Sequence, residues 1–194
     1  DAPLAVASST RGVLMSGAAR DRAFASLRSA LREILLGRQL SLGLGHGDLW
    51  AGNLFYEAGG TAPHDVRISG LIDWDTARKD APEGWDAGHM AITLRMSKNT
   101  EELGPAISAL LREGAWSDEE YRQFAEAGLG GPLCRGGDPE LQWALVILIW
   151  LHHVSAGVAK ADGRARNRLW CTANVDRVLL AACNTPPWSR HVEG

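Results

Sequence analysis

The amino-acid sequence predicts an α+β domain that is mostly α-helical and carries one small β-hairpin. Two patterns lead to this class. Apolar residues recur every three or four positions over most of the chain beyond Trp85, and two short strand-like runs flank a turn before that point. The 194 residues, 45% of them hydrophobic, are enough for one domain with its own core. We therefore expect a single domain over residues 1–194.

The first part of the chain is expected to hold one helix and the hairpin. Phe24, Leu27 and Leu31 follow helical spacing, and Gly37 is placed to end that helix. Asn53–Tyr56 and Val66–Ile72 are the two strand-like runs. The expected order is an irregular lead-in over 1–17, a helix over 18–37, and a loop with the hairpin over 40–77.

Residues 85–184 are expected to form a helical subdomain. Ser117 and Glu120 have the spacing of a capping box, which begins a helix. An acidic residue followed by Pro139 is typical of another helix start. The run 141–159 is apolar on nearly all sides, which predicts the central buried helix.

Composition argues against several classes of protein. The 20 Lys and Arg nearly balance 23 Asp and Glu, so no basic surface for nucleic acid or an anionic membrane is expected. The longest apolar run, Trp143–Leu151, is about half of the roughly 20 residues that a membrane span needs. Three Cys without CxxC spacing favour a cytoplasmic protein. The N-terminal segment has no initiator Met or leader pattern, which suggests a cut end.

Three oxygen-bearing side chains stand near the ends of the predicted strands. Asp48 and Asn53 are five residues apart in the segment HGDLWAGN, and Asp73 follows in LIDWD. In kinase catalytic loops an Asp orients the attacking hydroxyl, while an Asn five residues on and a separate Asp hold Mg²⁺ at the nucleotide phosphates. The spacing therefore fits phosphoryl transfer, with the three donors converging around one divalent ion.

These two motifs resemble the catalytic core of the aminoglycoside phosphotransferase and choline kinase-like superfamily, whose members carry an HGDxxxxN loop and an IDW segment. The resemblance implies a protein-kinase-like C-terminal lobe. It implies that Asp48 is the catalytic base and that Asn53 and Asp73 bind Mg²⁺. It also implies ATP or GTP as the phosphate donor, bound at Asn53, Asp73 and Ile72.

Three further residues are expected to support this site. By the same resemblance His46 supports the loop from behind, and Asp86, at the start of the next helix, braces it. Ala follows Asp86 where the family usually has Leu, and Asp75 stands where Glu is frequent. Asp73 and Asp75 are two apart on the expected strand and share a face, so one is a ligand while the other is a solvated or supporting group. A plain alternative remains, because Asp48 and Asn53 are also common in ordinary turns.

Other polar residues have simpler interpretations. His64 and His89 are isolated and typical of surface or core positions. His152 and His153 are adjacent on a helix, about 100° apart, so local hydrogen bonds are favoured over a metal pair. A solvated helix face is favoured over an acidic wall for a cationic substrate at Glu113, Asp118, Glu119, Glu120 and Glu126.

The expected function is Mg²⁺-dependent transfer of a nucleotide γ-phosphate to a hydroxyl of a small molecule, such as a sugar, an aminoglycoside or an amino alcohol. The 45 residues before His46 show no strand, Gly loop and strand with a Lys. We therefore expect the N-terminal lobe to be absent from this chain, to lie in the same polypeptide, and to be needed for activity. A non-catalytic kinase-like binding or regulatory domain fused to another enzyme is the alternative. Metal-dependent hydrolysis at Asp48, Asp73 and Asp75 ranks lowest, since no suitable His ligand set is evident.

Overall fold

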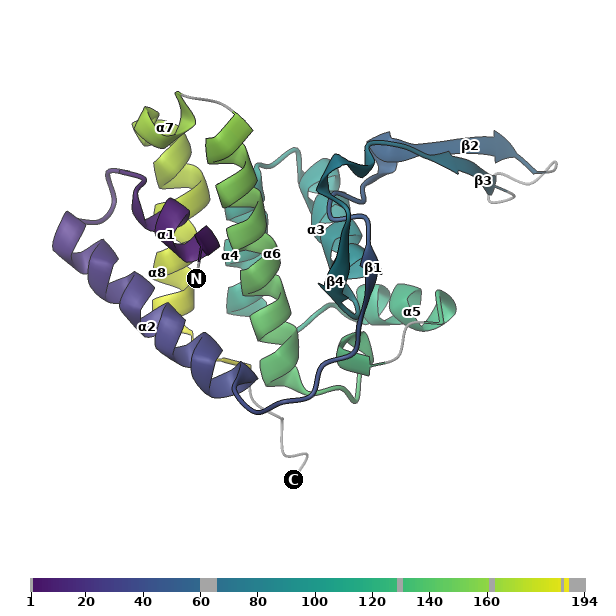
Figure 1. Cartoon of the computed structure of the whole chain (residues 1–194), viewed down its shortest axis with the longest axis horizontal. Helices are drawn as coiled ribbons and strands as arrows, with labels where there is room; N and C mark the ends of the chain where they lie inside the picture. Colours follow the sequence, from purple (N-terminus) through teal and green to yellow (C-terminus); the bar gives the residue numbers. More distant parts are fainter. Residues whose placement is uncertain (1, 60–65, 129–130, 161–162, 186, 189–194) are drawn as a thin grey trace.

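The computed structural model describes residues 2–59, 66–128, 131–160, 163–185 and 187–188 (Figure 1). The chain is mostly helical and has two small antiparallel sheets of two strands each. The helices are α1 (Ala2–Ser8), α2 (Gly17–Leu35), α3 (Trp85–Asn99), α4 (Leu103–Glu113), α5 (Asp118–Glu126), α6 (Pro139–Lys160), α7 (Arg168–Cys171) and α8 (Arg177–Asn184). The strands are β1 (Leu42–Gly45), β2 (Leu54–Ala58), β3 (Val66–Leu71) and β4 (Arg78–Pro82).

Helix α6 lies at the centre of the helical body, as its apolar sequence predicts. Helices α1, α2, α3 and α4 all contact it (Figure 1). Trp143, Ile147 and Trp150 are almost fully buried there. By length and composition alone α6 would be able to cross a membrane, but 61% of its most apolar window is buried inside the fold. Such burial is typical of the core helix of a folded domain.

Two helix starts follow the local signals in the sequence. Ser117 caps α5, and the side chain of Glu120 returns a bond to the Ser117 backbone, so the predicted capping box is confirmed. At the start of α6, the N–H of Glu140 donates to Asp138 Oδ1 over 3.0 Å. These starts were predictable because capping depends on residues only two or three positions apart.

The first 17 residues differ from the expected irregular lead-in. Residues 2–8 form α1, which packs on α6 and buries Ala7 completely. A helix of seven residues is not stable by itself in water, so α1 is helical because it packs against α6. The irregular segment is therefore confined to the residues between α1 and α2.

A buried ion pair joins this irregular segment to the C-terminal helices. Arg20 on α2 pairs with Asp176, and both side chains are almost without solvent exposure. The N–H of Leu14 also donates to Asp176 Oδ2 over 2.9 Å. A side chain at Gly12 would overlap Asp176, with its Cβ 2.0 Å from Oδ2. The pair therefore depends on the close approach that Gly12 allows.

The expected hairpin is present, but a second strand pair encloses it. Strands β2 and β3 form the hairpin, and the turn predicted between them lies mostly in residues 60–65, outside the described residues. Strands β1 and β4 pair on either side of it in the sequence, with Gly43 opposite Ala81. This second pair was missed because the sequence of β4, RKDAP, has no apolar alternation.

The two strand pairs have different surroundings. The β2–β3 hairpin extends away from the helices, and its Phe55, Tyr56 and Ile68 are exposed (Figure 1). The β1–β4 pair lies beside α3, where Gly45 and Ala81 are buried. The loop with the polar motif leaves β1 at the buried Gly45 and leads into the projecting hairpin.

Candidate active site

The polar loop from His46 to Asn53 turns sharply at Gly47. Gly47 has φ +84°, a conformation that favours glycine, and an added Cβ would lie 2.4 Å from the carbonyl oxygen of Thr76. The hydroxyl of Thr76 donates to the carbonyl oxygen of His46 over 3.1 Å. The loop therefore packs directly against the segment that follows β3.

Asp86, in the first turn of α3, holds the start of this loop. Its Oδ2 accepts the N–H of His46 at 2.7 Å, and its Oδ1 accepts the N–H of Gly47 at 3.0 Å. A carboxylate that accepts two backbone N–H groups fixes their orientation strongly. The structure thus places Asp86 where it can brace the loop.

His46 connects the loop to the segment containing Asp73. It is buried, and its Nδ1 accepts the N–H of Asp48 at 3.3 Å. Its Nε2 therefore carries the proton and donates to the carbonyl oxygen of Ile72 over 2.8 Å. The imidazole also lies 4.7 Å from the Trp74 ring, centroid to centroid. His46 thus supports both halves of the predicted site.

Asn53 lies between the other two predicted donors. Its side-chain Nδ2 donates to the backbone oxygen of Asp48 over 2.9 Å, and its own carbonyl oxygen accepts the N–H of Ile72 at 3.1 Å. Asp73 follows in a left-handed conformation, with φ +65°. The loop and the Asp73 segment are therefore held side by side at the base of the hairpin.

The amide of Asn53 and the carboxylate of Asp73 fit an oxygen-liganded cation. The bond from Nδ2 leaves Oδ1 of Asn53 free, and no group among the described residues pairs with either oxygen donor. Mg²⁺ takes oxygen ligands and keeps several waters, so two protein donors beside a nucleotide suffice. On this chemistry the residues present suit a Mg²⁺ ion.

Asp75 lies in the turn after Asp73 and has a protein partner of its own. Strand β3 ends at Leu71 and a 3₁₀ turn begins at Trp74, so the expectation that Asp73 and Asp75 share one strand face is wrong. The carboxylate of Asp75 instead lies 3.7 Å from Nζ of Lys160, and both side chains are more than half exposed. The left-handed turn at Asp73 separates the roles of the two acids.

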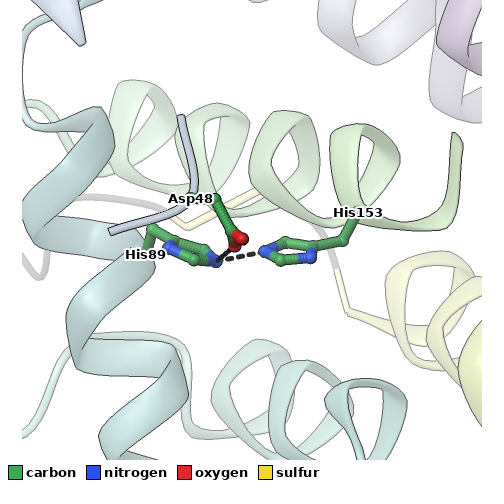
Figure 2. Close-up of side chains that lie close together, drawn as sticks. All are labelled: Asp48, His89 and His153. Carbon is green, nitrogen blue, oxygen red and sulfur yellow. Dashed lines mark hydrogen bonds and ion pairs between the residues drawn. The ribbon is translucent and has the colours of Figure 1, made fainter. Parts of the chain in front are cut away.

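Two histidines that the sequence did not assign to the site lie beside Asp48. His89 on α3 and His153 on α6 stack with their ring centroids 4.3 Å apart, and their Nε2 atoms are in contact (Figure 2). Oδ1 of Asp48 lies 3.8 Å from Nε2 of His89. Both neighbouring histidines of α6 therefore contact α3, His153 at His89 and His152 at the ring of Trp85. No local pattern could have paired residues 64 positions apart.

The surroundings of these imidazoles favour their neutral form. Burial lowers the pKa of His89, although its bond to Leu49 and the nearby Asp48 oppose this shift. Burial and the adjacent His89 lower the pKa of His153 to about 3. Both rings are therefore uncharged near neutral pH.

The acidic residues of α4 and α5 are mostly paired. Arg95 on α3 binds both Glu113 and Glu120, and Glu120 is buried. Asp118 pairs with Arg135 and Glu119 with Arg122, and these side chains are exposed. The expectation of a simply solvated face is therefore wrong for Glu120. His64 lies outside the described residues.

The comparisons with known proteins gave one match. A sequence profile described as a phosphotransferase enzyme family, APH, matches residues 10–126, which is more than half of the chain. This range contains the polar loop, both strand pairs and α3. No curated protein and no solved structure matches the chain.

Proposed function

Because the chain belongs to the APH phosphotransferase enzyme family, we propose that it is the catalytic lobe of a small-molecule kinase. The lobe corresponds to the C-terminal lobe of the protein-kinase-like fold. The reaction is transfer of the γ-phosphate of ATP or GTP to a hydroxyl group. Asp48 acts on that hydroxyl, and Asn53 and Asp73 hold Mg²⁺.

One difference in hydrogen bonding supports this proposal. His46 and Asp86 hold the backbone of the loop by hydrogen bonds, yet among the described residues no group pairs with Oδ1 of Asn53 or with the carboxylate of Asp73. Folding normally pairs such groups or leaves them in water. Two unpaired donors on a rigid support are therefore suited to a cation and a phosphate.

Each residue has a defined task in the transfer. When bound, Mg²⁺ neutralises charge on the phosphates. The Asp48 carboxylate orients the acceptor hydroxyl and takes its proton as the oxygen forms a bond to the γ-phosphorus. The bond from that phosphorus to the bridging oxygen breaks, and a nucleoside diphosphate leaves. Ile72, with its exposed side chain beside Asp73, contacts the nucleotide.

The remaining parts of the proposal follow from the family. The acceptor is a sugar, an aminoglycoside or an amino alcohol. The lobe that covers the nucleotide belongs to the same polypeptide. The cytoplasmic setting is proposed from the three Cys without CxxC spacing. No part is assigned to nucleic acid or to a membrane.

Nucleotide binding to the chain is the direct test. Calorimetric titration with ATP and with GTP is expected to show binding that requires Mg²⁺. Asp73→Asn is expected to weaken it about 10–100-fold, as loss of support for a metal does. Asp80→Asn removes the same charge from an exposed residue paired with Arg78 and is the matched control. Equal affinity in both variants would contradict the assignment of Asp73.

A turnover assay separates the two classes of function. The polypeptide with its upstream region is supplied with γ-labelled nucleotide and a panel of sugars, aminoglycosides and amino alcohols. Transfer to a hydroxyl supports the kinase. Mg²⁺-dependent nucleotide binding without transfer to any acceptor, and without slow hydrolysis, would favour the binding or regulatory domain.

A further inference from the structure

The cluster of Asp48, His89 and His153 joins three elements at one point. The three side chains come from the polar loop, α3 and α6, and each directs a ligand atom toward the others (Figure 2). One carboxylate oxygen and two imidazole nitrogens all lie within 4.8 Å of one another. Neither the proposed transfer nor the Asn53 and Asp73 pair uses the two histidines.

The hydrogen bonding of His89 leaves its inner nitrogen ready to bind a metal. Nδ1 of His89 lies 2.8 Å from the carbonyl oxygen of Leu49. A carbonyl only accepts, so Nδ1 carries the proton and Nε2 has the free lone pair. Metal-binding histidines typically donate their other N–H to such a carbonyl, which fixes the ring. Nε2 of His89 is therefore fixed toward Asp48 and His153.

We propose that Asp48, His89 and His153 form a binding site for a divalent transition metal of the Zn²⁺ type. Zinc binds imidazole nitrogen and carboxylate oxygen at about 2.0–2.2 Å, so tetrahedral ligand atoms lie about 3.3 Å apart. The 3.8 Å between Asp48 and His89 is close to this spacing. The two Nε2 atoms, which are in contact in this structure, would separate to about 3.3 Å when the ion binds.

The donor set distinguishes this site from the Mg²⁺ site. Two neutral imidazoles suit zinc, cobalt or nickel, whereas Mg²⁺ prefers an all-oxygen shell. His89 is buried, but the side chain of Asp48 is 27% exposed. The ion therefore enters from the side of Asp48, and its fourth position, which water or another small ligand fills, faces the same side.

Occupation of this site has a consequence for the transfer, which rests on the proposed function. A zinc ion bound to Asp48 takes up the carboxylate that would orient the acceptor hydroxyl. Zinc is then expected to inhibit by lowering kcat, without competing for the nucleotide. The site would make the kinase sensitive to a metal that is not its own cofactor.

Metal titration of the full chain tests the binding directly. Zn²⁺ is added in calorimetry, and Co²⁺ is followed by visible absorption, which is intense for a tetrahedral site. One equivalent is expected, and His153→Gln is expected to weaken binding at least about tenfold, since it removes one of three ligands. His152→Gln removes the adjacent histidine, whose ring meets Trp85, and is expected to bind as the unchanged chain does.

Two controls keep the outcomes distinct. Asp73→Asn leaves this cluster intact, so zinc affinity should persist while Mg²⁺-nucleotide binding falls. Circular dichroism of His153→Gln checks the fold, and Zn²⁺ should raise Tm only where His153 is present. Zinc affinity that is the same in His153→Gln as in His152→Gln, or a weak octahedral Co²⁺ spectrum, would overturn the proposal and leave a simple histidine hydrogen bond. Zinc binding to the chain, with no phosphate transfer by the polypeptide that includes the nucleotide-covering lobe, would support this site and contradict the kinase.

Discussion

The helical body around α6 and the polar face around Asp48 are held together in different ways. In the body, large apolar side chains such as Trp143 and Trp150 are completely enclosed. At the polar face, Asp86 accepts backbone N–H groups and His46 donates to the carbonyl oxygen of Ile72, and these bonds hold a partly buried loop. Burial of apolar area stabilises the first region, whereas directed bonds orient the second. Substitutions in the body should therefore change stability, and those at the face should change chemistry.

The largest effect on stability is expected from the buried ion pair. Asp176→Ala leaves the guanidinium of Arg20 buried without its partner, and the free energy of unfolding should fall by about 3–5 kcal/mol. Urea unfolding followed by tryptophan fluorescence measures it. Arg67→Ala breaks the exposed pair with Glu57 and should cost at most about 1 kcal/mol. Similar losses of unfolding free energy in both variants would contradict the expected difference between the buried and the exposed ion pair.

The largest effect on chemistry is expected at Asp48. Asp48→Ala in the polypeptide with its upstream region should lower phosphate transfer about 10²–10⁴-fold, the usual contribution of a general base. Its Tm should stay close to that of the unchanged protein, because the side chain is partly exposed and the loop is held by backbone bonds. Transfer that persists within a factor of about three would show that Asp48 does not act on the hydroxyl.

Substitution of Asp86 should lower both stability and phosphate transfer, because Asp86 holds the loop backbone at the candidate site. Asp86→Ala leaves the N–H groups of His46 and Gly47 without their acceptor, which should cost about 1–3 kcal/mol. Transfer should fall as well, since the loop loses its support. Thermal unfolding and turnover are measured on the same sample, and Asp80→Ala is the control. A fall in activity with no change in Tm would mean that Asp86 acts otherwise than as a brace.

The buried histidines should add a pH dependence of stability that is smallest near neutral pH. Above the ordinary histidine pKa of about 6.5, His153 is neutral in both folded and unfolded chains. Between that pH and its folded pKa of about 3, only the unfolded chain takes up the proton. Stability should therefore fall as the pH is lowered, by about 1.4 kcal/mol per pH unit for each such proton. His153→Gln should flatten this slope in urea titrations, and an unchanged slope would refute it.

Much of the fold was predictable because it depends on neighbours in sequence. The spacing of Phe24, Leu27 and Leu31 predicted α2 to within two residues at each end, over Gly17–Leu35 against 18–37. The capping box at Ser117 was equally local. The β1–β4 pair was not predictable, because its strands are about 35 residues apart and β4 is polar.

The candidate site also has one part that the sequence predicted and one part that it did not. Asp48 and Asn53 share one short loop, so their spacing alone indicated a common role. The left-handed turn at Asp73, which separates it from Asp75, is a backbone conformation that a residue other than glycine rarely takes. The strand pattern of the sequence therefore did not predict the left-handed conformation at Asp73.

By itself the sequence determined the family and the helical body. The family was recognisable from two short motifs, and the helices from apolar spacing between residues that are close in sequence. Only the tertiary structure decided that His89 and His153 meet at Asp48. Their contact requires α3 to pack against α6, for example where Gly88 approaches Ile149, and the two histidines are 64 positions apart in sequence. Long-range packing thus placed the histidines of the proposed second metal site beside a loop whose motif could be recognised from the sequence alone.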